Sequence, residues 1–340
     1  MRVLVLIVGC LLADAQAQEL QFGSLGNLRL ENGQTIRNCK IGYRTFGKLS
    51  ADKSNVILFT TWFTGTTKQL AGFMGPGKLV DTSRYFAIAV DAIGDGDSIS
   101  PSNSPDQPRM RFPKFTIRDM VESQYRLVTE TLHLSHLYAV MGISMGGMQT
   151  FQWTVSYPEF LDKAIPIVGS PRLTSYDLLL WEGELHAIEE DAQWNGGNYQ
   201  SPPALQALAD MHELALTTPE FRVAHTSPAQ FAGYLQGVEK SGPDRFDANN
   251  WHRQLEAMIA DDVSKPFGGS MEKAAAAVKA KLLVIVSAQD HMVNPTPARG
   301  FAELTHAKLV ELTGPCGHLA NGCEQDTVIR AVAEFLGSVR

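Results

Sequence analysis

The sequence lacks the features that would mark a nucleic-acid-binding, membrane-spanning or disordered protein. Among its 340 residues, 29 Lys and Arg face 36 Asp and Glu, which gives a net charge of −7, and no basic run stands out. Without such a run there is no electrostatic surface for nucleic acid or for an anionic membrane. After residue 12, no apolar run reaches the roughly 20 residues of a membrane-spanning helix. The 44% of hydrophobic residues is instead typical of a folded globular chain.

The first residues carry the pattern of a secretory signal peptide. Met1-Arg2 gives a basic start, residues 3–12 form a short apolar run, and residues 13–18 read Ala-Asp-Ala-Gln-Ala-Gln. This pattern predicts cleavage after Ala17 and a mature protein that is exported, either to a periplasm or to the medium. Two alternatives remain open, namely lipidation at Cys10 within Ile-Val-Gly-Cys and a buried N-terminal strand.

Cysteine is scarce, which excludes a disulfide scaffold. Only Cys39, Cys316 and Cys323 remain after the expected cleavage, and nothing around them has the spacing of a zinc site. In an oxidising compartment, Cys316 and Cys323 are close enough in sequence to pair and to brace the loop between them. The alternative is that both are free, partly buried thiols.

Strand and helix patterns alternate along most of the chain. Apolar runs predict strands at residues 36–45, 55–61, 85–90, 137–143, 164–168, 282–287 and 308–312, and apolar spacing of three and four predicts helices at residues 116–132, 145–156, 297–304 and 324–336. This alternation predicts an α/β fold with a mostly parallel sheet covered by helices on both faces. Residues 171–276 lack strand patterns, so we expect a helical lid inserted into a core made of residues 18–170 and 277–340.

A nucleophile motif lies where one of these strands meets a helix. Residues 142–146 read Gly-Ile-Ser-Met-Gly, the G-x-S-x-G form, directly between an apolar strand and a helix. Glycines at both ends allow strand and helix to approach closely, and the helix N-terminus favours developing negative charge near Ser144. Ser144 is therefore the candidate nucleophile, although glycines in such a pattern can also mark an ordinary turn.

A serine nucleophile needs a base, which an acid must orient. Asp290 follows the strand at residues 282–287, and His318 follows the strand at residues 308–312. Both lie at the carboxyl ends of predicted parallel strands, where ligands bind in open α/β sheets. The sequence thus predicts a Ser144–His318–Asp290 triad. Taken singly, Asp290 can also be a turn cap and His318 a surface loop residue.

The remaining histidines and acidic residues give no metal pattern. We interpret the histidines of the insertion as surface residues: His186, His212, His225 and His252. The Asp95-Gly96-Asp97 loop resembles part of a calcium loop but lacks the ligand ladder of an EF-hand. We expect no metal and no cofactor.

Several segments resemble a known enzyme family. They are Gly75-Pro76-Gly77-Lys78, residues 81–86 (Asp-Thr-Ser-Arg-Tyr-Phe), residues 116–120 (Thr-Ile-Arg-Asp-Met), residues 142–149 (Gly-Ile-Ser-Met-Gly-Gly-Met-Gln) and residues 194–199 (Trp-Asn-Gly-Gly-Asn-Tyr). They are similar to α/β-hydrolases of the homoserine O-acetyltransferase family, from about residue 30 to the end of the chain. The resemblance implies the same triad and an oxyanion hole built from the backbone amides of Met145 and Phe63.

Two departures from that family argue against homoserine as substrate. Family members that use homoserine carry an Asp directly after the catalytic His, where this chain has Leu319, and an Arg in the lid, where residues 204–218 contain none. A site without both charged partners leaves the substrate's ammonium and carboxylate unpaired. The expected export also separates the protein from cytoplasmic acetyl-CoA.

The sequence therefore predicts an exported serine hydrolase, an esterase acting on a small ester or acyl substrate through an acyl-serine intermediate. Two alternatives stay open: an O-acyltransferase that moves the acyl group to an alcohol, and a non-catalytic binding protein on a hydrolase scaffold. We expect no nucleic-acid partner and no membrane span. The oligomeric state is open, and a dimer through the lid is one arrangement the sequence allows.

Overall fold

The computed structural model describes residues 19–337, apart from the side chains of residues 241–245. The expected signal peptide, residues 1–17, and the alternative lipidation site at Cys10 lie outside the described residues. No helix within residues 19–337 combines the length and apolar character needed to cross a membrane.

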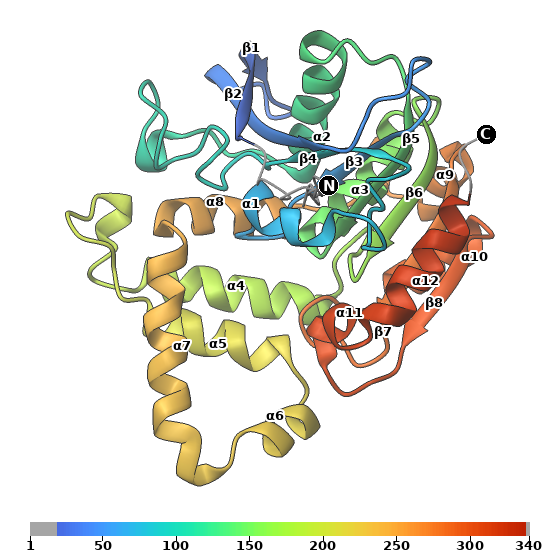
Figure 1. The fold of residues 1–340 in the computed structure, drawn as a ribbon. Helices are drawn as coiled ribbons and strands as arrows, with labels where there is room; N and C mark the ends of the chain where they lie inside the picture. Colours follow the sequence, from blue (N-terminus) through green and yellow to red (C-terminus); the bar gives the residue numbers. More distant parts are fainter. Residues whose placement is uncertain (1–18, 338–340) are drawn as a thin grey trace, which may run out of the picture.

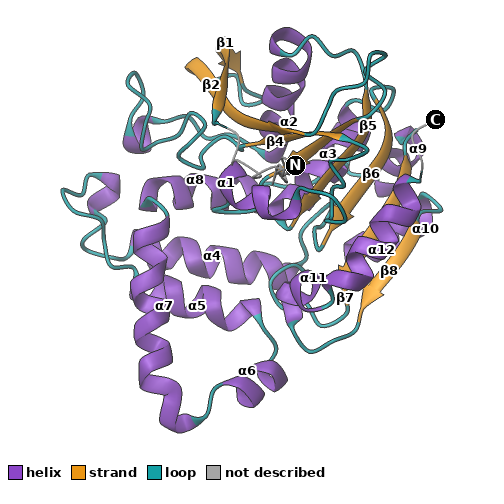
Figure 2. Cartoon of the chain, in the orientation of Figure 1, coloured by secondary structure: helices purple, strands orange, loops and turns teal. Residues whose placement is uncertain are grey.

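One twisted sheet forms the centre of the described chain (Figures 1 and 2). Its eight strands lie in the order β1-β2-β4-β3-β5-β6-β7-β8, and all neighbours are parallel except β1–β2 and β2–β4. The strands are β1 Gln21–Arg29, β2 Thr35–Phe46, β3 Val56–Thr60, β4 Phe86–Val90, β5 Leu137–Ile143, β6 Leu161–Ile167, β7 Lys281–Ser287 and β8 Lys308–Leu312. The predicted mostly parallel α/β sheet is therefore confirmed.

The central strands are apolar at successive positions because helices cover both faces of the sheet. Every residue of β3 is buried, and alternate residues belong to two separate apolar clusters. Leu58 packs with the cluster on one face, and Ile57 and Phe59 pack on the other. The first cluster includes side chains of α2 Ile117–Arg126, α3 Met145–Ser156, α9 Met271–Ala277 and α10 Thr296–Leu304; the second includes those of α1 Thr67–Leu70 and α12 Gln325–Leu336.

Two elements differ from the expectations. Strand β1 was not predicted, because its pairing with β2 shifts register around Gly26 and the buried Leu25 and Leu28 are three positions apart. Such irregularities break the two-residue period by which a strand is recognised. The helix expected over residues 116–132 ends at Arg126, and residues 127–131 continue as a wider π-helical turn.

Between β6 and β7 the described chain adds no strand to the sheet. It forms six α-helices and three short 3₁₀ turns; the α-helices are α4 Ser175–Glu189, α5 Gln206–Leu216, α6 Pro219–His225, α7 Phe231–Arg245, α8 Ala248–Ile259 and α9. We refer to residues 171–276 as the helical insertion. Figure 1 shows α4, α5, α6 and α7 grouped to one side of the sheet, whereas α8 returns toward it.

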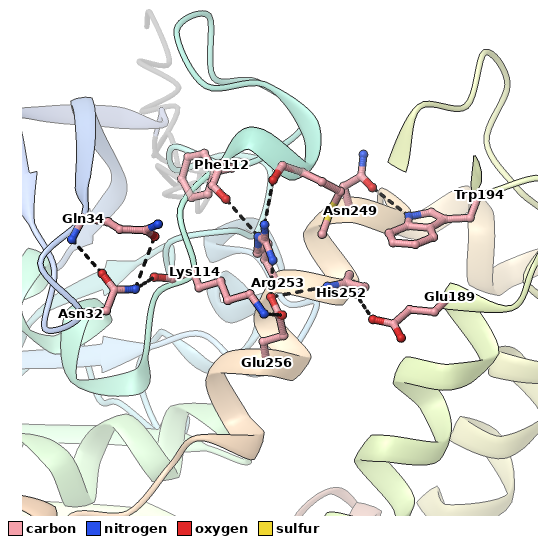
Figure 3. A network of polar contacts seen from close by, with 11 residues as sticks. Asn32, Gln34, Phe112, Lys114, Glu189, Trp194, Asn249, His252, Arg253 and Glu256 are labelled. Atoms are coloured by element: carbon pink, nitrogen blue, oxygen red, sulfur yellow. Dashed lines mark hydrogen bonds and ion pairs between the residues drawn. The ribbon is translucent and has the colours of Figure 1, made fainter. Parts of the chain in front are cut away.

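Polar contacts hold α8 against the core segment at residues 110–114 (Figure 3). Arg253 donates hydrogen bonds to the carbonyl oxygens of Phe112, at 3.1 Å, and Met110, at 2.8 Å. Its guanidinium also pairs with Glu256, which pairs in addition with Lys114. Because the Arg253 side chain is buried, these contacts fix the helix at a defined position on the core.

Candidate active site

Ser144 occupies a sharp turn between β5 and α3. It is the N-cap of α3 and has φ 58° and ψ −122°, a backbone conformation that costs a non-glycine residue free energy. The flanking glycines make the turn possible. A Cβ on Gly142 would lie 2.2 Å from the carbonyl oxygen of Gly146, and one on Gly146 would lie 2.6 Å from the carbonyl oxygen of Thr60. The sequence therefore dictates a tight elbow that lifts the serine above the sheet.

The structure brings the three predicted residues together at the carboxyl ends of β5, β7 and β8. His318 Nε2 lies 2.8 Å from Ser144 Oγ, and His318 Nδ1 lies 2.8 Å from Asp290 Oδ2. All three side chains are buried. Because a carboxylate only accepts hydrogen bonds, Nδ1 carries the hydrogen and Nε2 is left to accept the Ser144 hydroxyl hydrogen.

Backbone amides and a second aspartate hold the loop that carries Asp290. Asp290 Oδ1 accepts hydrogen bonds from the N–H groups of Met292, at 2.9 Å, and Val293, at 2.8 Å. One residue further on, the N–H of Asn294 donates to Asp177 Oδ1 at 2.8 Å. Asp177 belongs to α4, so the helical insertion is tied directly to the loop of the candidate acid.

The loop of His318 is braced by a disulfide and by the insertion. Cys316 and Cys323 are joined as a disulfide with 6.5 Å between their Cα atoms, and His318 lies in a 3₁₀ turn between them. Gly317 has φ 62°, and a Cβ there would lie 3.1 Å from the carbonyl oxygen of Leu216. The end of α5 and the turn after it thus pack directly against the backbone of Gly317, the residue before the candidate base.

The two backbone amides expected to form the oxyanion hole, those of Met145 and Phe63, have no hydrogen-bond partner among the described residues. Met145 is the first residue of α3, so its N–H has no partner within the helix. In the turn after β3, the N–H of Thr64 donates to Gln254 Oε1 and that of Gly65 to the carbonyl oxygen of Trp62. Among the hydrogen bonds of the described residues, none uses the N–H of Phe63. This leaves Phe63 and Met145 available as donors.

A cavity of about 340 Å³ opens above Ser144; we call it the Ser144 cavity. Its described lining contains no Lys, Arg, Asp or Glu and is mostly apolar: Trp62, Phe63, Thr64, Phe73, Ile143, Ser144, Trp181, His212, Leu216, Met292, His318, Leu319 and Asn321. Leu319, the residue directly after His318, lies in this wall. The volume is at the small end for ligand sites, and the lining favours an uncharged substrate.

Two histidines of the insertion do not lie on the surface as expected. His252 is 3% exposed and its Nε2 lies 2.9 Å from Glu189 Oε1. His212 lines the Ser144 cavity, and its Nδ1 lies 3.1 Å from Oε1 of the fully buried Glu184. The sequence expectation was wrong because the helices of the insertion pack against one another and against the core. The spacing of residues 184 and 212 gives no sign of this contact.

In the acidic loop at residues 95–97, the Asp95 carboxylate binds backbone N–H groups of the same loop. Asp95 Oδ1 accepts hydrogen bonds from the N–H groups of Asp97, at 3.0 Å, and Ser98, at 2.8 Å. Burial and the neighbouring Asp91 raise the pKa of Asp95 well above its ordinary value. Among the side chains that the structure describes, residues 19–240 and 246–337, no three or more of His, Cys, Asp or Glu are grouped to hold a metal ion.

Comparison with known proteins agrees with this fold. A family model described as alpha/beta hydrolase fold matches residues 56–322. Ethyl acetate hydrolase of Pseudomonas veronii is 34% identical over 277 residues, which cover 78% of this chain and 79% of the relative. Homoserine O-acetyltransferase of Methanococcoides burtonii is 32% identical over 316 residues, which cover 82% of this chain and 64% of the relative. The solved structure of the acetyl esterase MekB superposes with a TM-score of 0.86 and 29% identity, over 94% of this chain and 96% of that one.

The chain therefore belongs to the α/β-hydrolase family. Within it, the relatives include both esterases and homoserine O-acetyltransferases, as the sequence motifs indicated. These relatives make it a hydrolase or acyltransferase enzyme.

Proposed function

We propose that the protein is an exported esterase that hydrolyses small, uncharged esters through an acyl–Ser144 intermediate. The observation that carries the proposal is the hydrogen-bonded chain Ser144–His318–Asp290, in which Ser144 and His318 line a cavity with no Lys, Arg, Asp or Glu in its described lining. The relatives named ethyl acetate hydrolase and acetyl esterase support short acyl esters as the substrate class.

The chemistry proceeds in two steps. In the first, Ser144 Oγ attacks the ester carbonyl while His318 Nε2 takes the hydroxyl proton, and the N–H groups of Met145 and Phe63 stabilise the tetrahedral oxyanion. His318 then gives the proton to the departing alcohol, which leaves the acyl group on Ser144. In the second step, water attacks the acyl carbonyl with His318 again as base, and the acid is released. Asp290 holds the imidazole tautomer throughout.

An ester panel of varied acyl chain length tests the proposal. The mature protein should cleave short esters, and Ser144→Ala should abolish turnover without changing the melting temperature. The exposed Ser201 offers a matched control, since Ser201→Ala should keep full activity. A fluorophosphonate should label Ser144 alone. Folded protein that takes up no label and cleaves no ester would reject an enzyme and favour a binding protein on this scaffold.

A second candidate is acyl transfer from the same acyl-serine to an alcohol. It is supported by the relatives named homoserine O-acetyltransferase. Products formed with and without an added alcohol separate the two reactions: a hydrolase releases free acid in both cases, whereas a transferase forms a new ester when the alcohol is present.

Export is supported by the sequence of residues 1–17 alone. Expression of the full chain in a bacterial host, followed by N-terminal sequencing of the protein outside the cytoplasm, should give Gln18 as the first residue. Protein retained in the cytoplasm with Met1 intact would contradict export and leave the proposed chemistry untouched.

A further inference from the structure

The Ser144 cavity holds a second histidine–carboxylate pair that the ester chemistry does not use. His212, on α5, lines this cavity, and its Nδ1 lies 3.1 Å from Oε1 of Glu184, on α4. Figure 1 shows these two helices side by side in the insertion. Glu184 is fully buried, and its other oxygen, Oε2, accepts a hydrogen bond from Trp251 Nε1 at 3.4 Å. Both carboxylate oxygens are thus occupied, and the imidazole is held by one nitrogen only.

This pairing leaves a polar atom of His212 free to meet a ligand. Because the carboxylate accepts the Nδ1 hydrogen, the other nitrogen, Nε2, presents a lone pair when the ring is neutral. No hydrogen bond to another described residue involves Nε2. The side chain is 19% exposed, so it is packed on most of its surface but still reachable from the cavity.

The ring has little freedom to turn away. Phe63, Trp181 and Trp251 surround it, with ring centroids 5.9, 6.5 and 5.2 Å from that of His212. An oriented imidazole between aromatic walls is the kind of polar group that fixes a ligand in an otherwise apolar site.

Trp181, in the same wall, adds no second polar contact for a ligand. Its indole N–H has no hydrogen-bond partner among the described residues, but the Nε1 atom is enclosed by the surrounding protein and the residue is 1% exposed, so a ligand in the cavity does not reach it. The wall therefore offers a ligand the acceptor His212 Nε2.

We propose that His212 forms a hydroxyl-binding subsite of the Ser144 cavity, which selects esters that carry a hydroxyl group away from the scissile bond. A hydroxyl is a small uncharged group whose O–H can donate to His212 Nε2. Glu184 acts as a positioning residue that sets the tautomer of His212. The inference rests on the proposed esterase function and names the substrate class of that site.

Matched ester pairs test the subsite. 2-Hydroxyethyl acetate and propyl acetate differ only by a hydroxyl in place of a methyl group in the alcohol part, and ethyl 3-hydroxypropanoate and ethyl butanoate differ likewise in the acyl part. The measured quantity is the ratio of kcat/KM within each pair. His212→Asn is the informative variant, because the Asn amide can still donate to Glu184 from the place of Nδ1 but has no atom at Nε2. His225→Asn, an exposed histidine on α6, is its control.

In His212→Asn, kcat/KM for the hydroxyl ester divided by kcat/KM for its matched ester should fall about fivefold in at least one pair. This is the usual net effect of losing one hydrogen bond. His225→Asn should leave the same ratio unchanged. A ratio that stays unchanged in both pairs in His212→Asn, with turnover of propyl acetate and ethyl butanoate retained, would overturn the subsite while the esterase function stands. If the wild-type protein cleaves none of the four esters and Ser144 takes up no fluorophosphonate, the proposed function itself fails.

Discussion

Asp177 links the first helix of the insertion to the loop of the candidate acid. Its Oδ2 accepts the N–H of Thr174, the N-cap of α4, at 2.7 Å, and its Oδ1 accepts the N–H of Asn294 at 2.8 Å. Burial raises the pKa of this carboxyl, and the backbone hydrogen bonds oppose that effect. A single side chain thereby starts a helix and positions a catalytic loop.

Asp177→Asn should weaken both functions of this residue. The amide nitrogen of Asn cannot accept a hydrogen bond, so one of the two backbone N–H groups loses its acceptor. We expect the free energy of unfolding to fall by about 1–3 kcal/mol and kcat to fall with KM nearly unchanged, because Asp290 moves relative to His318. Urea unfolding and ester kinetics measure the two effects, with the exposed Asp210→Asn on α5 as control. A destabilised variant with wild-type kcat would show that the contact serves stability alone.

For single residues, the sequence predicts site residues that directly follow a strand, but it does not predict contacts between side chains of two different helices. Ser144, Asp290 and His318 were foreseeable because the carboxyl ends of parallel strands share one edge of the sheet. His212 and Glu184 were not, since their contact depends on how α4 and α5 pack, which no local pattern records. The unpaired Trp181 N–H was equally invisible, because an aromatic residue at helical spacing is read as core.

Helix α8 is held to the core by Glu256 as well as by Arg253. Burial opposes ionisation of Glu256, but hydrogen bonds and charges from His252, Arg253 and Lys114 outweigh it and lower its pKa to about 2. The unfolded chain has an ordinary glutamate pKa of about 4.3. A carboxyl with a lowered folded pKa stabilises the fold above the unfolded pKa, and this contribution is lost as the pH falls through the folded value.

Glu256→Gln should therefore remove an acid-sensitive part of the stability. Above about pH 4.5 the variant should be less stable than the wild type by up to about 3 kcal/mol, and the difference should shrink as the pH falls toward 2. Urea unfolding at successive pH values checks this, with the exposed Glu303→Gln as the matched control. A difference that does not change with pH would contradict the ionised network.

The Cys316–Cys323 disulfide should matter more for the rate than for the fold. A bridge across so short a loop removes little entropy from the unfolded chain, about 2–3 kcal/mol. A base displaced by about 1 Å can cost about a hundredfold in rate. We expect Cys316→Ala/Cys323→Ala to lower kcat by about ten- to a hundredfold while the protein still folds.

Thiol counting and a reductant complete this test. The denatured, unreduced mature protein should show one free thiol, Cys39, which burial keeps unreactive in the folded state by raising its pKa to about 12. Dithiothreitol should slow the wild-type enzyme and leave the double variant unchanged. Three free thiols would reject the bridge.

At the scale of whole elements, β5, α3 and β8 have the boundaries that the sequence predicted. The apolar run of β5 ends at Ser144, α3 ends two residues before Pro158, and Gly314 and Pro315 follow β8 closely. The edge strand β1 escaped prediction, since its irregular pairing with β2 removes the alternation. The order of strands in the sheet also lies beyond sequence pattern, because it is set by packing of the complete chain.

At the scale of the whole molecule, the described lining of the Ser144 cavity has no Lys, Arg, Asp or Glu to pair with a zwitterionic substrate. Arg222, which follows the Arg-free stretch at residues 204–218, pairs with Glu213 at 2.7 Å and stacks on Tyr234. We therefore expect kcat/KM for homoserine with acetyl-CoA to stay well below about 10⁴ M⁻¹s⁻¹. Leu319→Asp alone should not create the activity, since no group would hold the carboxylate. Efficient acetylation of homoserine by the wild-type protein, detected by mass spectrometry, would contradict the expected low kcat/KM.

The ribosome synthesises Ser144, Asp290 and His318 in that order, and this order has a consequence for incomplete chains. Ser144 is made 174 residues before His318, and between them come β6, the whole helical insertion and β7, which pairs directly with β6. A polypeptide halted by a premature stop codon within that interval carries Ser144 but not the proposed base. We therefore expect translation products that stop before residue 318 to be inert toward esters, because nothing in them takes the proton of the Ser144 hydroxyl.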